Sequence, residues 1–280
     1  MPESHFQELS YYEEVYPDYG LEGWDSVLGL TYERPMWLDD PRSPNTLASP
    51  FKTMVDSHAL ERNVFSIKLP RNDTEVGDIV FGGLNEDLSD EDSVVWNALY
   101  PENTTQWQIE VVGVSMSTCG ERERTGRETP VNYELKSYSG LFMTASPLLG
   151  FPKAIASSLL SRLPSEPSVC GREMVVPCSS VPDLPDLVIS LGGGHEIVLK
   201  ASDYVAEITL PWCSEPVVEC MPLIEAIPEQ VPGFELPKDL VILGSTFLKS
   251  VYTVFDWDEK RVGRKYFQLF EFEEGIGILY

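Results

Sequence analysis

Prolines interrupt the second half of the chain at short intervals, and this spacing rules out long helices there. Proline has no backbone N–H and clashes with the preceding turn, so it breaks a helix interior. Gly192-Gly193-Gly194 links two apolar runs in the way that a hairpin turn with positive φ requires. Regular short strands with turn signals predict an all-β fold. The runs expected to be strands are Met174–Pro177, Leu187–Leu191, Glu196–Lys200, Tyr204–Leu210, Tyr252–Phe255 and Lys265–Leu269.

Strand patterns are present in the first half as well. Val64–Leu69 alternates between apolar and polar residues, and Gly77–Leu84 ends at a Gly-Gly turn, so each predicts a strand. Trp107–Met116 predicts either two strands or one bent strand. Helical segments are expected at Pro50–Val55, at Lys153–Leu160 behind Pro152, and within Lys238–Ser250, where a short helix would be followed by a strand.

The chain is strongly acidic, with 45 acidic against 20 basic residues and a net charge of -25. Such a surface repels nucleic acid and anionic membranes, because phosphate contacts need Lys and Arg. It fits a protein that works at acidic pH and a merely soluble surface equally well. No apolar run of about 18 residues is present, so we expect no membrane span.

Two further features bear on the cellular compartment. The start of the chain, Met1–Phe6, has neither a basic beginning nor an apolar core and is therefore not a signal peptide. Asn72-Asp73-Thr74 and Asn103-Thr104-Thr105 have the form of glycosylation acceptors. The five cysteines are an odd number, which leaves at least one thiol without an intrachain partner.

Several kinds of chemistry find no support in the sequence. The three histidines, His5, His58 and His195, do not lie near a Gly-x-Ser-x-Gly elbow or a marked cysteine, which argues against serine or cysteine catalysis. Cysteines and histidines are not clustered at metal-ligand spacing, and no Lys-Ser/Thr follows the triple glycine. We therefore expect no metal and no cofactor.

The segment from Leu141 to Pro152 is the most informative one for function. Leu141-Phe142 leads into Met143-Thr144-Ala145, and a helix led by Pro152 is expected to follow. This segment resembles the second active-site loop of pepsin-like aspartic peptidases, in which two apolar residues lead into Asp-Thr/Ser-Gly. Aligned on Thr144 and Pro152, the resemblance places Met143 at the catalytic aspartate and Ala145 at the glycine.

Other landmarks of the pepsin-like family occur in the correct order over most of residues 23–263. They include a segment similar to Phe-Asp-Gly-Ile-Leu-Gly-Leu, a Phe-Ser strand, a Gly-Gly turn before an acidic loop, and Trp-Gln-Ile. The matching segments are Gly23–Leu30, Val64–Leu69, Ile79–Leu84, Trp107–Ile109, Val176–Cys178 with Leu184–Leu187, Val241–Leu248 and Tyr252–Asp256.

The resemblance implies a pepsin-like acid-protease fold with a partial N-terminal lobe in residues 1–105 and a nearly complete C-terminal lobe in residues 106–280. The front of the N-terminal lobe, with the first aspartate and the flap, is expected to be absent. We therefore expect the C-terminal lobe to fold independently and the truncated lobe to self-associate, because unpaired strand edges and apolar patches favour association.

Aspartic proteolysis needs two carboxylates that share one proton, and a thioether has no proton to exchange. The chain contains no Asp-Thr-Gly or Asp-Ser-Gly, and an alternative alignment on Ser139-Gly140 would place Tyr138 at the aspartate. Glu134 and Asp256 are the candidate substitutes. Glu134 is expected to lie too early in its strand to reach the loop, and the resemblance places Asp256 at a position that the family does not use catalytically. A side chain at Ala145 is expected to crowd the turn.

These departures predict a pepsin-like pseudoprotease that retains at most peptide or protein binding. The alternative is a fragment of an active acid endopeptidase from a truncated gene model. The resemblance also implies secretion or a vacuolar location. It pairs Cys178 with either Cys220 or Cys213, leaves Cys170 to take the other, and leaves Cys119 unpaired.

Overall fold

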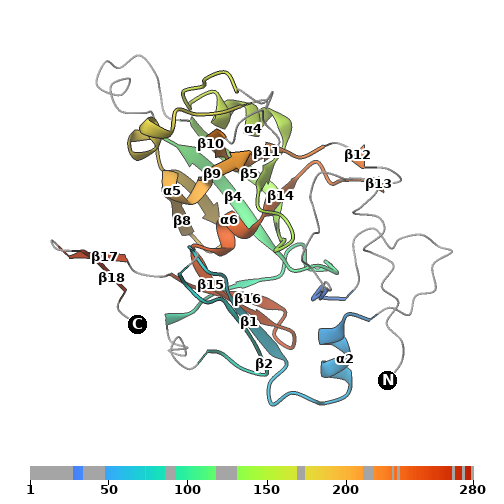
Figure 1. Cartoon of the computed structure of the whole chain (residues 1–280). Coiled ribbons are helices and arrows are strands. Elements are labelled where there is room, and N and C mark those ends of the chain that lie inside the picture. Colours follow the sequence, from blue (N-terminus) through green and yellow to red (C-terminus); the bar gives the residue numbers. More distant parts are fainter. Residues whose placement is uncertain are drawn as a thin grey trace.

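The structure is a computed structural model of the chain, and the all-β fold is confirmed. It describes residues 28–33, 48–72, 74–85, 93–117, 131–168, 174–210, 217–228, 230–231, 234–266, 269–272 and 275–278. Two sheets dominate these residues: a seven-stranded sheet in the upper part of Figure 1 and a five-stranded sheet below it. Among the described residues, none of the helices could span a bilayer.

The five-stranded sheet has the order β2-β1-β15-β16-β3 and is antiparallel throughout. Its strands come from two distant parts of the sequence, so the segments before and after residue 105 share one sheet. The strands are β1 (Val64–Lys68), β2 (Asp78–Phe81), β3 (Val95–Ala98), β15 (Val251–Asp256) and β16 (Arg261–Tyr266). This pairing argues against independent folding of residues 106–280, because β15 and β16 each take a partner from the first 105 residues.

The seven-stranded sheet has the order β11-β6-β14-β5-β4-β7-β8. Its strands are β4 (Gln108–Met116), β5 (Val131–Phe142), β6 (Leu149–Phe151), β7 (Leu187–Leu191), β8 (His195–Leu199), β11 (Ile224–Ala226) and β14 (Leu240–Leu243). The region expected to hold two strands or one bent strand forms the single strand β4, whose register shifts between Val111 and Gly113.

Short helices and three two-stranded sheets complete the described structure. The helices are α2 (Pro50–Asp56), α4 (Lys153–Leu160), the 3-10 helix η3 (Cys178–Asp183), α5 (Ala201–Tyr204) and α6 (Ser245–Leu248). The paired strands are β9 (Val205–Leu210) with β10 (Val217–Pro222), β12 (Gln230–Val231) with β13 (Phe234–Glu235), and β17 (Leu269–Phe272) with β18 (Gly275–Ile278).

One predicted order of elements is wrong. Within Lys238–Ser250 a helix was expected before a strand, but β14 comes first and α6 follows it. Leu240–Leu243 is a continuous apolar run. A buried strand and a buried helical segment can both contain such a run, so the pattern alone did not distinguish them. The order matters for the site, because Gly244 lies where the strand becomes the helix.

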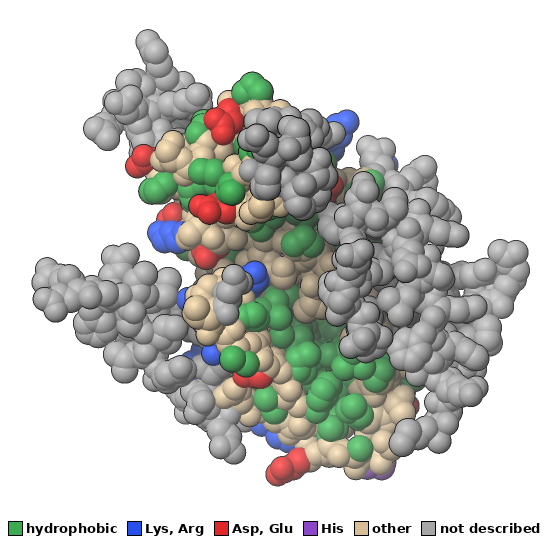
Figure 2. Space-filling model, viewed as in Figure 1, with side chains coloured by type: hydrophobic (Ala, Val, Ile, Leu, Met, Phe, Trp, Pro, Cys, Tyr) green, Lys and Arg blue, Asp and Glu red, His purple; other side chains and the backbone are tan. Residues whose placement is uncertain are grey.

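An aromatic cluster packs on one face of the five-stranded sheet. Phe65 of β1 stacks on Phe255 of β15 with ring centroids 4.5 Å apart, and Trp107 contacts both rings edge-on. Hydrophobic side chains also gather over this sheet and α2 in the lower half of the face in Figure 2. The rings come from both halves of the sequence, so the cluster joins these halves. Large aromatic side chains contribute strongly to core stability.

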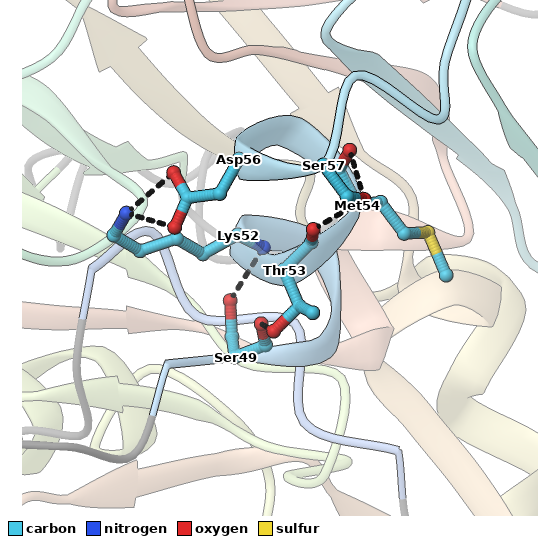
Figure 3. A network of polar contacts seen from close by, with 6 residues as sticks. All are labelled: Ser49, Lys52, Thr53, Met54, Asp56 and Ser57. Atoms are coloured by element: carbon cyan, nitrogen blue, oxygen red, sulfur yellow. Dashed lines mark hydrogen bonds and ion pairs between the residues drawn. The ribbon is translucent and has the colours of Figure 1, made fainter. Parts of the chain in front are cut away.

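Helix α2 covers part of this cluster and is held by its own polar contacts (Figure 3). Ser49 caps its start, since the Ser49 hydroxyl accepts a hydrogen bond from the Lys52 backbone N–H at 3.1 Å. Lys52 forms an i,i+4 ion pair with Asp56 at 2.7 Å. The helix also buries Phe51, whose ring lies 4.6 Å from that of Phe65.

A disulfide joins Cys178 to Cys220. Cys220 is one of the two partners that the resemblance implied for Cys178. The bond ties the start of η3 to β10, next to a backbone hydrogen bond of 2.9 Å from Val176 to Cys220. Cys170, Cys213 and Cys119 lie outside the described residues.

Candidate functional site

The candidate site is the loop of residues 143–148, which connects β5 to β6. Strand β14 lies between these two strands, parallel to β5 and antiparallel to β6. The loop therefore crosses over the end of β14, where the chain continues through Gly244 into α6. This crossing places residues 143–148 beside residues about a hundred positions later in the sequence.

Backbone hydrogen bonds fix the loop to the end of β14. Met143 N–H donates to the Leu243 carbonyl oxygen at 3.1 Å, and Ser245 N–H donates to the Ser146 carbonyl oxygen at 2.7 Å. Thr246 adds its hydroxyl, which donates to the Pro147 carbonyl oxygen at 2.5 Å. The conformation of the loop thus depends on peptide groups and on Thr246 rather than on the side chains of residues 143–145.

Sequence reasoning recognised Val241–Leu248 as a landmark but missed the role of Gly244. A Cβ atom on this buried glycine would meet the carbonyl oxygens of Leu148 and Ser146, the second at 2.5 Å. Its φ of -76° is ordinary, so the lack of space, and not the backbone conformation, requires glycine. A glycine that ends a buried apolar run was the available signal.

Replacing Gly244 with alanine is expected to destabilise the protein by about 3 kcal/mol, because backbone atoms cannot move aside for a methyl group as a flexible side chain can. The free energy of unfolding in urea measures this loss. Gly83→Ala is the matched control, since no atom lies within 4 Å of a Cβ at Gly83. Equal unfolding midpoints for the two variants would contradict the close approach.

The three residues at the predicted catalytic position differ in exposure. Met143 is half-buried, whereas Thr144 and Ala145 are exposed. Ala145 does not adopt a positive φ, which among the described non-glycine residues is confined to His58, Ser137 and Lys260. The expected crowding at Ala145 is therefore wrong, because its side chain lies at the surface in a conformation that alanine tolerates.

The loop contains no ionisable side chain, since residues 143–148 read Met-Thr-Ala-Ser-Pro-Leu. The Ser146 hydroxyl accepts a hydrogen bond from Leu148 N–H at 3.2 Å and so helps to shape the loop. Tyr138, the alternative aspartate position, lies within β5 opposite Val111 and not in the loop. By itself the loop can bind through backbone and hydroxyl groups, but it cannot exchange protons as a carboxylate does.

Each substitute carboxylate lies within a strand and not in the loop. Glu134 is exposed opposite Gly113, and Phe142 lies eight positions further along β5, a distance of about 27 Å. Asp256 lies in the five-stranded sheet and is 4% exposed. Its carboxylate accepts hydrogen bonds from Glu259 N–H at 3.2 Å and Arg261 Nε–H at 3.0 Å. Asp256 therefore stabilises the turn between β15 and β16.

The remaining sequence candidates are not brought to this loop. His195 begins β8, where it pairs with Leu191, and it is half-buried. His58 is exposed after α2, where it lines an open polar cavity of about 450 Å³ that also contains Asp256. His5 lies outside the described residues. Within the described part of the chain, no three His, Cys, Asp or Glu side chains are grouped to hold a metal ion.

Comparison with known proteins assigns the family. The family model for eukaryotic aspartyl protease matches residues 11–265, most of the chain. The chain belongs to the eukaryotic aspartyl proteases. This membership confirms the resemblance to pepsin-like aspartic peptidases that the ordered landmarks indicated.

Curated relatives from animals and fungi are similar to the chain at low identity. Cathepsin D of Clupea harengus is 28% identical over 251 residues, covering 86% of this chain and 53% of that protein. Pepsin A of Suncus murinus is 26% identical, with coverage of 86% and 53%, and vacuolar protease A of Neurospora crassa is 23% identical, with coverage of 86% and 51%. The chain spans about half the length of the curated relatives it matches.

Proposed function

We propose that this aspartyl protease homologue is proteolytically inactive and retains at most the binding of peptides or proteins. The observation that carries the proposal is the identity of the residues in the loop between β5 and β6. Met143-Thr144-Ala145 stands where the family's Asp-Thr/Ser-Gly is expected, and the loop has no ionisable group. Two carboxylates that share a proton are the chemical requirement of the family's reaction.

A longer chain would not complete the pair of carboxylates. An aspartate contributed from elsewhere would supply one carboxylate, and Met143 would still leave the pair incomplete. The alternative of a fragment of an active endopeptidase is therefore not favoured. Backbone hydrogen bonds from Met143 to Leu243 and from Ser245 to Ser146 hold the loop in shape. They support a loop that the peptide groups of a ligand can still contact.

Three further assignments accompany this proposal. Residues 1–105 correspond to part of the family's N-terminal lobe and residues 106–280 to its C-terminal lobe. The protein is secreted or vacuolar, which the Cys178–Cys220 disulfide supports, since disulfides persist mainly in oxidising compartments. The hydrophobic side chains visible over the five-stranded sheet in Figure 2 support self-association.

The test is cleavage of a quenched-peptide library by the purified chain from acidic to neutral pH, with and without pepstatin. We expect turnover at least about 10⁴-fold below that of a bovine cathepsin D assayed alongside, because losing a catalytic group costs about this much. Met143→Leu should give the same result as the unmodified chain. Pepstatin-sensitive cleavage that is absent from a mock purification would overturn the proposal.

A further inference from the structure

The connection between β3 and β4 presents an asparagine at the surface. Pro101, Glu102 and Asn103 are all exposed, and Thr104 N–H closes the turn on the Pro101 carbonyl oxygen at 2.8 Å. Asn103 is followed by Thr104 and Thr105, so the exposed residue begins an Asn-x-Thr triplet. Such a triplet is the acceptor sequence for N-linked oligosaccharides.

We propose that the side-chain amide of Asn103 is an acceptor for an N-linked oligosaccharide. The donor is an oligosaccharide carried on a polyprenyl diphosphate. The amide nitrogen Nδ2 forms a bond to C1 of the first sugar, the C1–O bond to the diphosphate breaks, and the diphosphate leaves with the electron pair. One amide proton passes to a base of the transferase. The inference rests on the secretory location proposed above and is independent of the proposed loss of proteolysis.

The fold accommodates this modification without breaking a contact. Among the described residues, the Asn103 side chain forms no hydrogen bond, ion pair or ring contact, so a sugar can replace one hydrogen on Nδ2 freely. Backbone bonds hold the chain on both sides of the turn. Tyr100 N–H donates to the Gln108 carbonyl oxygen at 2.9 Å, and Glu33 N–H donates to the Thr105 carbonyl oxygen at 3.0 Å.

Side-chain bonds hold the turn from within and do not involve Asn103. The Thr104 hydroxyl donates to Gln108 Oε1 at 2.8 Å and accepts a hydrogen bond from Gln106 N–H at 3.1 Å. Thr104 therefore bonds to the buried residues Gln106 and Gln108, while Asn103 stays exposed. A glycan on Asn103 is expected to leave the turn and the following strand β4 unchanged.

The second acceptor triplet differs in its local contacts. Asn72 is exposed, but its Oδ1 accepts hydrogen bonds from both Thr74 N–H at 2.9 Å and the Thr74 hydroxyl at 2.6 Å. Its Nδ2 donates to Glu75 Oε1 at 3.4 Å. These contacts link residues that are close in sequence, so they can form in the nascent chain. They then occupy the amide and hydroxyl groups that a transferase must recognise. Asn72 is thus a natural comparator for Asn103.

The experiment expresses the full chain behind an added leader peptide in a eukaryotic secretory host. Intact mass and peptide mapping are compared before and after peptide N-glycosidase, which converts a glycosylated Asn to Asp. We expect the unmodified chain to carry a glycan at Asn103. Asn103→Gln and Thr105→Ala should each lose one glycan mass, whereas Thr105→Ser should retain it and Asn72→Gln should leave the Asn103 glycan in place.

The proposal is overturned if Asn103→Gln carries the same glycan mass as the unmodified chain. It is overturned equally if the unmodified chain lacks a glycan while a reporter glycoprotein from the same cells carries one. Because the leader is supplied, a negative result concerns the acceptor site and not the route of secretion. Neither result depends on peptide cleavage, so the proposed inactivity stands or falls separately.

Discussion

Residues 106–280 expressed alone are expected to aggregate instead of forming a folded lobe. Removing residues 1–105 takes away β1, which pairs with β15, and β3, which pairs with β16. A two-stranded remnant would be left, and its strand β15 is buried at every position. Isolated two-stranded sheets are marginally stable in water, and exposed apolar edge strands promote aggregation.

Size-exclusion chromatography and urea unfolding of this fragment, beside the full chain in the same buffer, measure the effect. Co-refolding residues 1–105 with residues 106–280 is the matched rescue, because it returns β1 and β3 to the sheet. Rescue in trans would show that strand pairing, and not a processing error, causes the loss. A monomeric fragment 106–280 with one cooperative unfolding transition would refute the shared-sheet argument.

Replacing Phe65 with alanine is expected to destabilise the full chain by about 4 kcal/mol, within the range for truncating a buried aromatic residue. Phe65 is 1% exposed, and its ring contacts aromatic rings from both halves of the sequence. These contacts lie at 4.6 Å to Phe51, 5.7 Å to Trp107 and 4.5 Å to Phe255 between ring centroids. The alanine variant leaves a cavity at the centre of this cluster.

Val76→Ala is the control for this substitution. Val76 lies on the connection between β1 and β2 and is 82% exposed, so its truncation should change the free energy of unfolding by less than about 0.5 kcal/mol. Urea unfolding followed by tryptophan fluorescence reports on both variants. Similar midpoints for Phe65→Ala and Val76→Ala would mean that the aromatic cluster does not couple the two halves.

Local pattern was a reliable guide where each segment's own residues decide its structure. The strand β1 and the helix α4 were both predicted close to their observed bounds, because alternation and a leading proline are local signals. The Lys238–Ser250 segment was predicted in the wrong order, because an apolar run such as Leu240–Leu243 suits either a strand or a buried helix.

In the candidate site, too, some features follow from the sequence and others only from the tertiary structure. The lack of a carboxylate at Met143 is a property of the sequence, and no arrangement of the loop can alter it. The close approach of Gly244 to the loop could not be predicted from the loop itself, since it depends on β14 inserting between β5 and β6. The exposure of Ala145 is likewise a result of that arrangement.

The sequence by itself determined the all-β class, the membership of the aspartyl protease family and the chemistry that residues 143–148 lack. The tertiary structure alone decided that the two halves of the chain share a sheet and that the loop is fixed by the end of β14. The physical reason is that alternation specifies which face of a strand is apolar but not which strand will cover it. Phe65 and Phe255 pair because the whole fold brings β1 to β15.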